Sequence, residues 1–176
     1  MDGKILGIDP GTRIAGYGVL SLNPLDIVDY GCIKPPSNAS LEEKYLYLHE
    51  AFQQLIALHT PSYIAVEEQF IHKNVKSSMK LYGVNAALMI ASAKAKIPLS
   101  FYSATEGKKA VTGHGLASKQ ALKRSLEALF QIDDITPEDA SDALALAYCH
   151  ANRVKWQSRC TTILQDPYRK KARRKW

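Results

Sequence analysis

The hydrophobic pattern opens with an apolar run at residues 5–8 that stops at a single carboxylate, Asp9. A Pro-Gly pair then turns the chain into a second apolar stretch at 16–22, and a third follows at 27–33 after Asn23-Pro24. Short apolar runs bounded by turn residues are typical of β-strands. We therefore predict an antiparallel meander in which Asp9 lies at the mouth of a buried strand.

Helical and strand-like patterns alternate through the rest of the chain. Ser40 and Glu43 form a capping-box pattern that opens a helix ending near Pro61, and residues 63–66 are a short buried strand that ends in Glu67 and Glu68. Beyond them the pattern predicts a loop at 69–77, a helix at 78–94, a strand at 97–102 and helices at 105–111 and 118–130.

The last predicted helix has a clear beginning. Thr136 is expected as its N-cap, Pro137 as its first helical residue, and Asp139 lies near the positive end of the helix dipole. Residues 143–149 carry no charge, as expected for a helix that packs against a sheet.

The composition fits one domain, because 176 residues with 46% hydrophobic content can bury a sizeable core. No apolar run reaches the roughly 18 residues of a membrane span, and the N-terminus has no signal pattern, so we expect a cytoplasmic protein. The cysteines Cys32, Cys149 and Cys160 match no zinc spacing and favour a reducing compartment over a disulfide scaffold.

Positive charge is concentrated at the C-terminal end. Residues 166–176 contain six basic residues and one acid, which accounts for most of the net charge of +6. Such a segment favours a polyanion such as nucleic acid, although a solvated tail without a fixed partner remains an alternative. We therefore divide the chain into a domain at 1–156 and a basic tail at 157–176, which has either nonspecific DNA affinity or disorder.

Carboxylates gather where predicted elements begin or end. Asp139 and Asp142 are three residues apart and so neighbours on one helical face, where a divalent cation would relieve their repulsion. With Asp9 and Glu67 they form a set of oxygen ligands that suits Mg²⁺ or Mn²⁺ rather than zinc. Two such ions promote displacement at phosphorus. The pattern alone does not choose between Glu67 and Glu68, and Asp9 and Asp139 are also ordinary residues for a turn and a first helical turn.

Two phosphate-binding motifs are excluded. Residues 11–16 have the glycine spacing of a P-loop, but Tyr17 stands where the motif requires lysine. No GxGxxG follows any predicted strand.

Four segments together resemble the RuvC family of bacterial Holliday junction resolvases, within the ribonuclease H-like superfamily. They are ILGIDPGTRIAGYGV at 5–19, AVEEQFIHKNVKSSMKL at 65–81, GHGLASK at 113–119 and DASDALALA at 139–147. The resemblance implies an α/β, ribonuclease H-like fold, with a mixed five-stranded sheet and helices on both faces. It also implies a homodimer that nicks opposed strands of four-way junction DNA, with two Mg²⁺ ions per active site for which Mn²⁺ substitutes. The branch-migration helicase complex (RuvA and RuvB) is a further partner implied by the family.

The same resemblance assigns roles to individual residues. It makes Asp9, Glu67, Asp139 and Asp142 the catalytic, metal-binding acids, and so favours Glu67 over Glu68. It further implies DNA contacts for Phe70, which would stack on a base, and for Lys108, Lys119 and Arg13. A core position for Phe70 and a solvated helix charge for Lys119 are the structural alternatives.

Two other functions fit the sequence less well. A phosphotransferase of the actin and sugar-kinase type also has a strand, Asp-x-Gly-Thr, strand motif, but it needs a second phosphate loop in a second domain, which this chain lacks. A junction-binding protein without catalysis needs no acid cluster beside a polyanion. The sequence therefore favours a metal-dependent nuclease.

Overall fold

A single mixed sheet organises the molecule. The computed structural model describes residues 2–69 and 75–165, in which the strand order is β3-β2-β1-β4-β5. The strands are β1 (Lys4–Asp9), β2 (Ala15–Leu22), β3 (Leu25–Ile33), β4 (Tyr63–Glu67) and β5 (Leu99–Tyr102). The pairs β1–β2 and β2–β3 are antiparallel, whereas β1–β4 and β4–β5 are parallel. This arrangement confirms both the predicted meander and the mixed five-stranded sheet.

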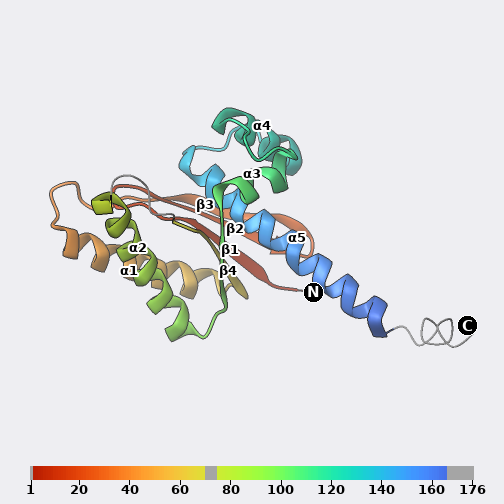
Figure 1. Cartoon of the computed structure of the whole chain (residues 1–176), viewed down its shortest axis with the longest axis horizontal. Helices are drawn as coiled ribbons and strands as arrows, with labels where there is room; N and C mark the ends of the chain where they lie inside the picture. Colours follow the sequence, from red (N-terminus) through yellow and green to blue (C-terminus); the bar gives the residue numbers. More distant parts are fainter. Residues whose placement is uncertain (1, 70–74, 166–176) are drawn as a thin grey trace, which may run out of the picture.

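Helices cover both faces of this sheet (Figure 1). The helices α1 (Leu41–His59) and α2 (Val75–Ala95) lie on one face, and α3 (Ala104–Thr112), α4 (Lys119–Phe130) and α5 (Asp139–Gln165) lie on the other. The capping box at Ser40 is confirmed, while α2 begins at Val75 rather than near Ser78. None of the helices in the described part of the chain has both the length and the apolar character needed to cross a lipid bilayer.

Side-chain alternation along the central strands separates two cores. In β1, Leu6 and Ile8 pack into the core beneath α1 and α2, whereas Ile5 belongs to the core beneath α5. In β4, Val66 faces the α1–α2 side and Ala65 faces α5. Because successive side chains of a strand point to opposite faces, these positions fix which way the acids at the strand ends point.

The helix α5 lies directly against the backbone of the sheet. An added Cβ at Gly7 would be 2.0 Å from the carbonyl oxygen of Ala143, and one at Gly16 would be 2.2 Å from that of Asp139. Both distances are far inside van der Waals contact, so no larger residue fits while α5 keeps its place. The uncharged stretch of α5 predicted to pack on the sheet is buried, as its Leu144 shows with an exposed fraction of 0%.

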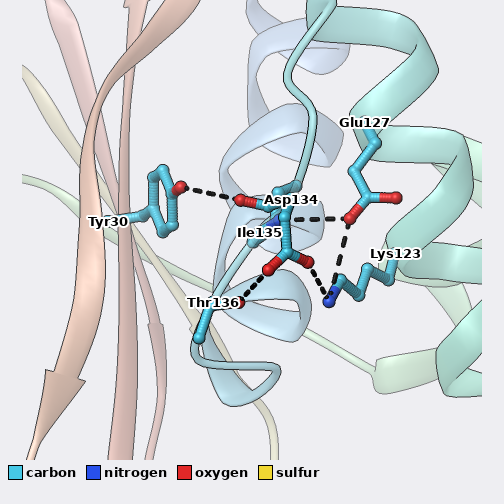
Figure 2. A network of polar contacts seen from close by, with 6 residues as sticks. All are labelled: Tyr30, Lys123, Glu127, Asp134, Ile135 and Thr136. Atoms are coloured by element: carbon cyan, nitrogen blue, oxygen red, sulfur yellow. Dashed lines mark hydrogen bonds and ion pairs between the residues drawn. The ribbon is translucent and has the colours of Figure 1, made fainter.

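Polar contacts fix the segment that leads into α5 (Figure 2). Lys123 Nζ forms an ion pair with Asp134, and Glu127 accepts a hydrogen bond from the backbone N–H of Ile135 at 3.1 Å. On the other side, the hydroxyl of Tyr30 on β3 donates to the Asp134 carbonyl at 3.3 Å. The segment is therefore tied to both α4 and the sheet before α5 begins.

Two predictions about α5 were wrong in detail. Thr136 is not its N-cap: the helix begins at Asp139, and the Thr136 hydroxyl donates instead to the carboxylate of Asp134. The helix also continues to Gln165, so residues 157–165, assigned to the tail from the sequence, are helical. The remaining part of that tail, 166–176, lies outside the described residues.

The substitution Gly7→Ala should destabilise the protein, because its Cβ cannot fit against the Ala143 carbonyl unless α5 moves. We expect a loss of about 1–3 kcal/mol in the free energy of unfolding, measured by urea denaturation. Gly107→Ala is the matched control, since its Cβ would face the flexible end of Leu146 at 3.3 Å and would add helix propensity to α3. Equal stability of the two variants would contradict the close approach of α5.

Candidate functional site

Asp9 and Glu67 meet at the ends of two adjacent parallel strands. Asp9 lies two residues after Gly7 in β1, and Glu67 lies two residues after Ala65 in β4, so both side chains point to the face of the sheet that α5 covers. The two side chains share a hydrogen bond. Glu68, the alternative to Glu67, is exposed. It is the next residue along the chain, so its side chain points to the opposite face of the sheet, where it lines a cavity beside α2. Of the two adjacent glutamates, the structure therefore pairs Glu67 with Asp9.

The proximity of two buried carboxyl groups changes their proton affinity. Burial, the charge of Glu67 and the hydrogen bond to it raise the pKa of Asp9 to about 8. Burial is also the largest reason that the pKa of Glu67 is raised, and the charge of Asp142 raises both. At neutral pH and without a cation, the Asp9–Glu67 pair therefore tends to retain a proton.

Asp142 comes to the same place from the first turn of α5. Its Oδ2 lies 3.3 Å from Nζ of Lys119, the first residue of α4. The Asp142 side chain is 16% exposed and that of Lys119 is 61% exposed. The charge of Asp142 is the largest cause of the raised pKa of Lys119, with smaller contributions from Asp139 and Asp9.

Asp139 lies at the edge of this group, as the half-buried first residue of α5. Together with burial, its charge raises the pKa of the Cys32 thiol on β3. The sheet register explains why Cys32 is close enough to feel this charge, because Gly16 pairs with Cys32 on one side and its backbone approaches Asp139 on the face covered by α5. The spacing of the cysteines along the chain gave no sign that Cys32 lies near these acids.

The other predicted residues are more dispersed. Lys108 is half-buried on α3, and its positive charge counteracts the rise in the pKa of Glu67. Arg13 is exposed in the turn between β1 and β2. Phe70, the predicted stacking residue, lies outside the described residues.

The residues present fit a hard divalent cation by their chemistry, although the acids are not drawn tightly together. Within residues 2–69 and 75–165, no three acidic, histidine or cysteine side chains form a group that could hold a metal ion. Carboxylate oxygens from three separate segments are nevertheless the ligands that Mg²⁺ and Mn²⁺ prefer. Burial and the charge of Glu67 raise the pKa of Asp9, so a negative charge at this place is unfavourable without a cation beside it.

The substitution Asp9→Asn should stabilise the metal-free protein at neutral to mildly alkaline pH. The pKa of Asp9 in the folded protein is raised from 3.8 to about 8, so the contribution of Asp9 to wild-type stability is greatest below pH 4 and is lost as the pH rises through 8. The asparagine of the variant keeps a neutral side chain at every pH. Its advantage should therefore be near zero at pH 4 and greatest near pH 8, where each kcal/mol raises Tm by roughly 2–4 °C.

Thermal unfolding in EDTA across this pH range measures the effect. The exposed Asp26 on β3 provides the control, because Asp26→Asn removes a carboxylate far from the site and should show no such trend. An Asp9→Asn protein that is no more stable than wild type at pH 8 would show that Asp9 is not an unfavourably buried anion.

Known proteins are similar to this chain in sequence and in fold. The profile of the family "Crossover junction endodeoxyribonuclease RuvC" matches residues 5–150. The RuvC of Protochlamydia amoebophila is 46% identical over 150 residues, covering 84% of this chain and 89% of that protein. The RuvC of Syntrophotalea carbinolica is 40% identical over 151 residues, covering 85% and 94%.

Solved structures agree with the sequence relatives. Thermus thermophilus RuvC in complex with a Holliday junction substrate superposes with a TM-score of 0.81 at 25% identity, covering 88% of this chain and 96% of that one. The yeast mitochondrial Holliday junction resolvase Ydc2, at 16% identity and a TM-score of 0.61, shares the fold. The ribonuclease H-like α/β fold expected from the sequence is thereby confirmed, and the chain belongs to the RuvC family of crossover junction endodeoxyribonucleases.

Proposed function

We propose that this protein is a structure-specific endonuclease that resolves Holliday junctions by paired, metal-dependent hydrolytic nicks in opposed DNA strands. The observation that carries this proposal is the convergence of Asp9, Glu67 and Asp142 from β1, β4 and α5. Family membership supports it, as does the likeness to a relative solved with a Holliday junction substrate.

Asp9, Glu67 and Asp142 would hold the metal ions, with Asp139 at the edge of the group. Two Mg²⁺ ions, or Mn²⁺ in their place, would supply activation of the attacking water and stabilisation of the charge on the leaving oxygen. The partly buried carboxylates supply fixed negative charge for these cations. Water attacks phosphorus and the bond to the 3′ oxygen breaks, leaving a 5′-phosphate and a 3′-hydroxyl.

Basic side chains near the acids would receive the DNA backbone. Lys119 and Lys108 both act electrostatically on Glu67, so a phosphate that approaches the acids meets positive charge. Arg13 on the β1–β2 turn, Phe70 and the basic segment 166–176 are further predicted DNA contacts. Without such cations, the acids would repel a polyanion.

Glu67→Gln should abolish cleavage of a labelled four-way junction while preserving junction binding, because it removes a metal ligand but no basic contact. Glu50→Gln is the control: the same change at an exposed glutamate on α1, away from the acids, should cut at close to the wild-type rate. Asp9→Asn should behave like Glu67→Gln.

Gel-based cleavage assays with and without Mg²⁺, together with fluorescence anisotropy for binding, measure these outcomes. A Glu67→Gln protein that cuts normally would refute the assignment of the acids. Wild-type protein that binds the junction without cutting it would instead indicate a non-catalytic junction-binding protein.

A homodimer would place two such sites on opposed strands, and α2 offers a surface for it. Large apolar side chains are exposed along this helix and on the adjoining β5: Val75, Met79, Tyr82, Met89, Ile90 and Phe101. A cavity of about 290 Å³ opens between the two elements and is lined by Tyr82, Met89 and Phe101. A continuous exposed apolar surface of this kind is typical of a subunit interface. The branch-migration helicase complex remains a predicted further partner.

Met89→Glu should convert the dimer to a monomer, because it places a charge in the middle of this apolar surface. Sedimentation or light scattering measures the mass, and the cleavage assay should show loss of paired nicks. Leu58→Glu is the control, since Leu58 is an even more exposed apolar residue, at 72%, but lies on α1. Met89→Glu protein that remains dimeric would exclude α2 as the interface.

A further inference from the structure

The ion pair between Lys119 and Asp142 joins two side chains with unequal access to water. Asp142 is 16% exposed, so its carboxylate has lost most of its hydration and needs a nearby cation. Lys119 is 61% exposed, so its ammonium group is well hydrated whether or not it stays in the pair. Breaking the pair is therefore unfavourable mainly because it leaves the poorly hydrated Asp142 without a counter-charge.

The position of Lys119 in α4 points to a role outside the helix itself. It is the first residue of α4, next to the N-cap Ser118, where the helix dipole disfavours positive charge. The first turns of α1 and α3 carry acids instead, Glu42 and Glu43 in α1 and Glu106 in α3. A lysine at this point costs the helix some stability, and its contact is with an acid on another element.

The charges that surround Lys119 are those that a metal ion would meet. Asp142, Asp139 and Asp9 all act on Lys119, so its ammonium group lies within the field of three of the four acids. In the described part of the chain, these acids do not assemble into a group that could enclose a metal ion. The ammonium group of Lys119 thus already occupies the place beside the acids where a metal ion would bind.

We propose that Lys119 acts, in the DNA-free protein, as a built-in counter-cation that holds Asp142 and must be displaced before a divalent metal ion binds. This inference rests on the proposed function, because it takes the acids to be metal ligands. Lys119 is here a positioning residue: it lowers the metal affinity of the resting site and keeps Asp142 in place. Because a DNA phosphate would compete with Asp142 for the ammonium group, the arrival of DNA would weaken the pair and favour binding of the metal by Asp142.

The test is Mn²⁺ binding by the DNA-free, full-length protein, measured by electron paramagnetic resonance of the unbound ion at fixed salt. Lys119→Met removes the competing cation and should bind Mn²⁺ about three- to tenfold more tightly than wild type. Lys119→Arg retains the charge and should stay within about twofold of wild type. Arg124→Met removes one exposed positive charge from the same helix and should also have little effect.

A purely structural role for Lys119 makes the opposite prediction, because an Asp142 that loses its support would bind the metal more weakly. Unchanged or weaker Mn²⁺ binding by Lys119→Met therefore overturns the inference, as does an equal gain in Arg124→Met, which would reflect overall charge alone. Circular dichroism checks that each variant is folded.

The cleavage assay separates this inference from the proposed function. If wild-type protein cuts the junction and Lys119→Met shows no gain in Mn²⁺ affinity, only the role of Lys119 is wrong. If wild type neither cuts the junction nor binds Mn²⁺, the proposed function fails and the inference fails with it.

Discussion

The direct contact between α5 and the backbone of β1 and β2 is the constraint on which the site depends. Gly7 and Gly16 leave no Cβ between the sheet and the helix carbonyls, and this brings the first turn of α5 over the end of β1. Asp142 can act on Asp9 and Glu67 only because of that approach. A residue with a side chain at either glycine would separate the helix from the strand ends. The smallest residues in the chain therefore determine where its most important charges lie.

The assembled acids are electrostatically unfavourable without a partner cation. Burial and mutual repulsion raise the pKa of Asp9 and Glu67, and Asp142 is held by a lysine from α4. An arrangement of this kind reduces folding stability and would be hard to explain as a structural device. It would become favourable if a divalent cation neutralised it, as the proposed function requires, so the same buried charges that lower the stability of the free protein would hold the metal.

Local patterns were enough to predict most of the secondary structure. The strands, the capping box at Ser40 and the buried stretch of α5 all follow from side-chain periodicity and cap chemistry, which depend on neighbours in the sequence. The start of α5 did not follow, because Asp134 engages the Thr136 hydroxyl and competes with a capping role. The hydrophobic pattern alone did not choose between Glu67 and Glu68. The family resemblance favoured Glu67, and the packing of Ala65 and Val66 on opposite faces gives the orientation of β4 that pairs Glu67 with Asp9.

Contacts between distant segments were the least predictable part of the site. Nothing in the sequence around Lys119 indicates that it pairs with Asp142, and nothing around Cys32 indicates that it lies beside Asp139. Both depend on how α4, α5 and β3 are placed in three dimensions. Gly16 and Gly18 were the one available signal for the position of α5. Glycine at alternate positions of a strand indicates that another segment packs closely on one face of that strand.

The placement of α5 also governs how the chain can fold while it is being made. β1 precedes the other described elements in the sequence and occupies the centre of the sheet, but the backbone at Gly7 is covered by α5, the last helix among the described residues. Until α5 has left the ribosome, the sheet backbone at Gly7 is uncovered and the core on its side cannot close. Folding of the domain is thus delayed until α5 has been made, and a truncated chain that lacks α5 would expose an apolar sheet surface prone to aggregation.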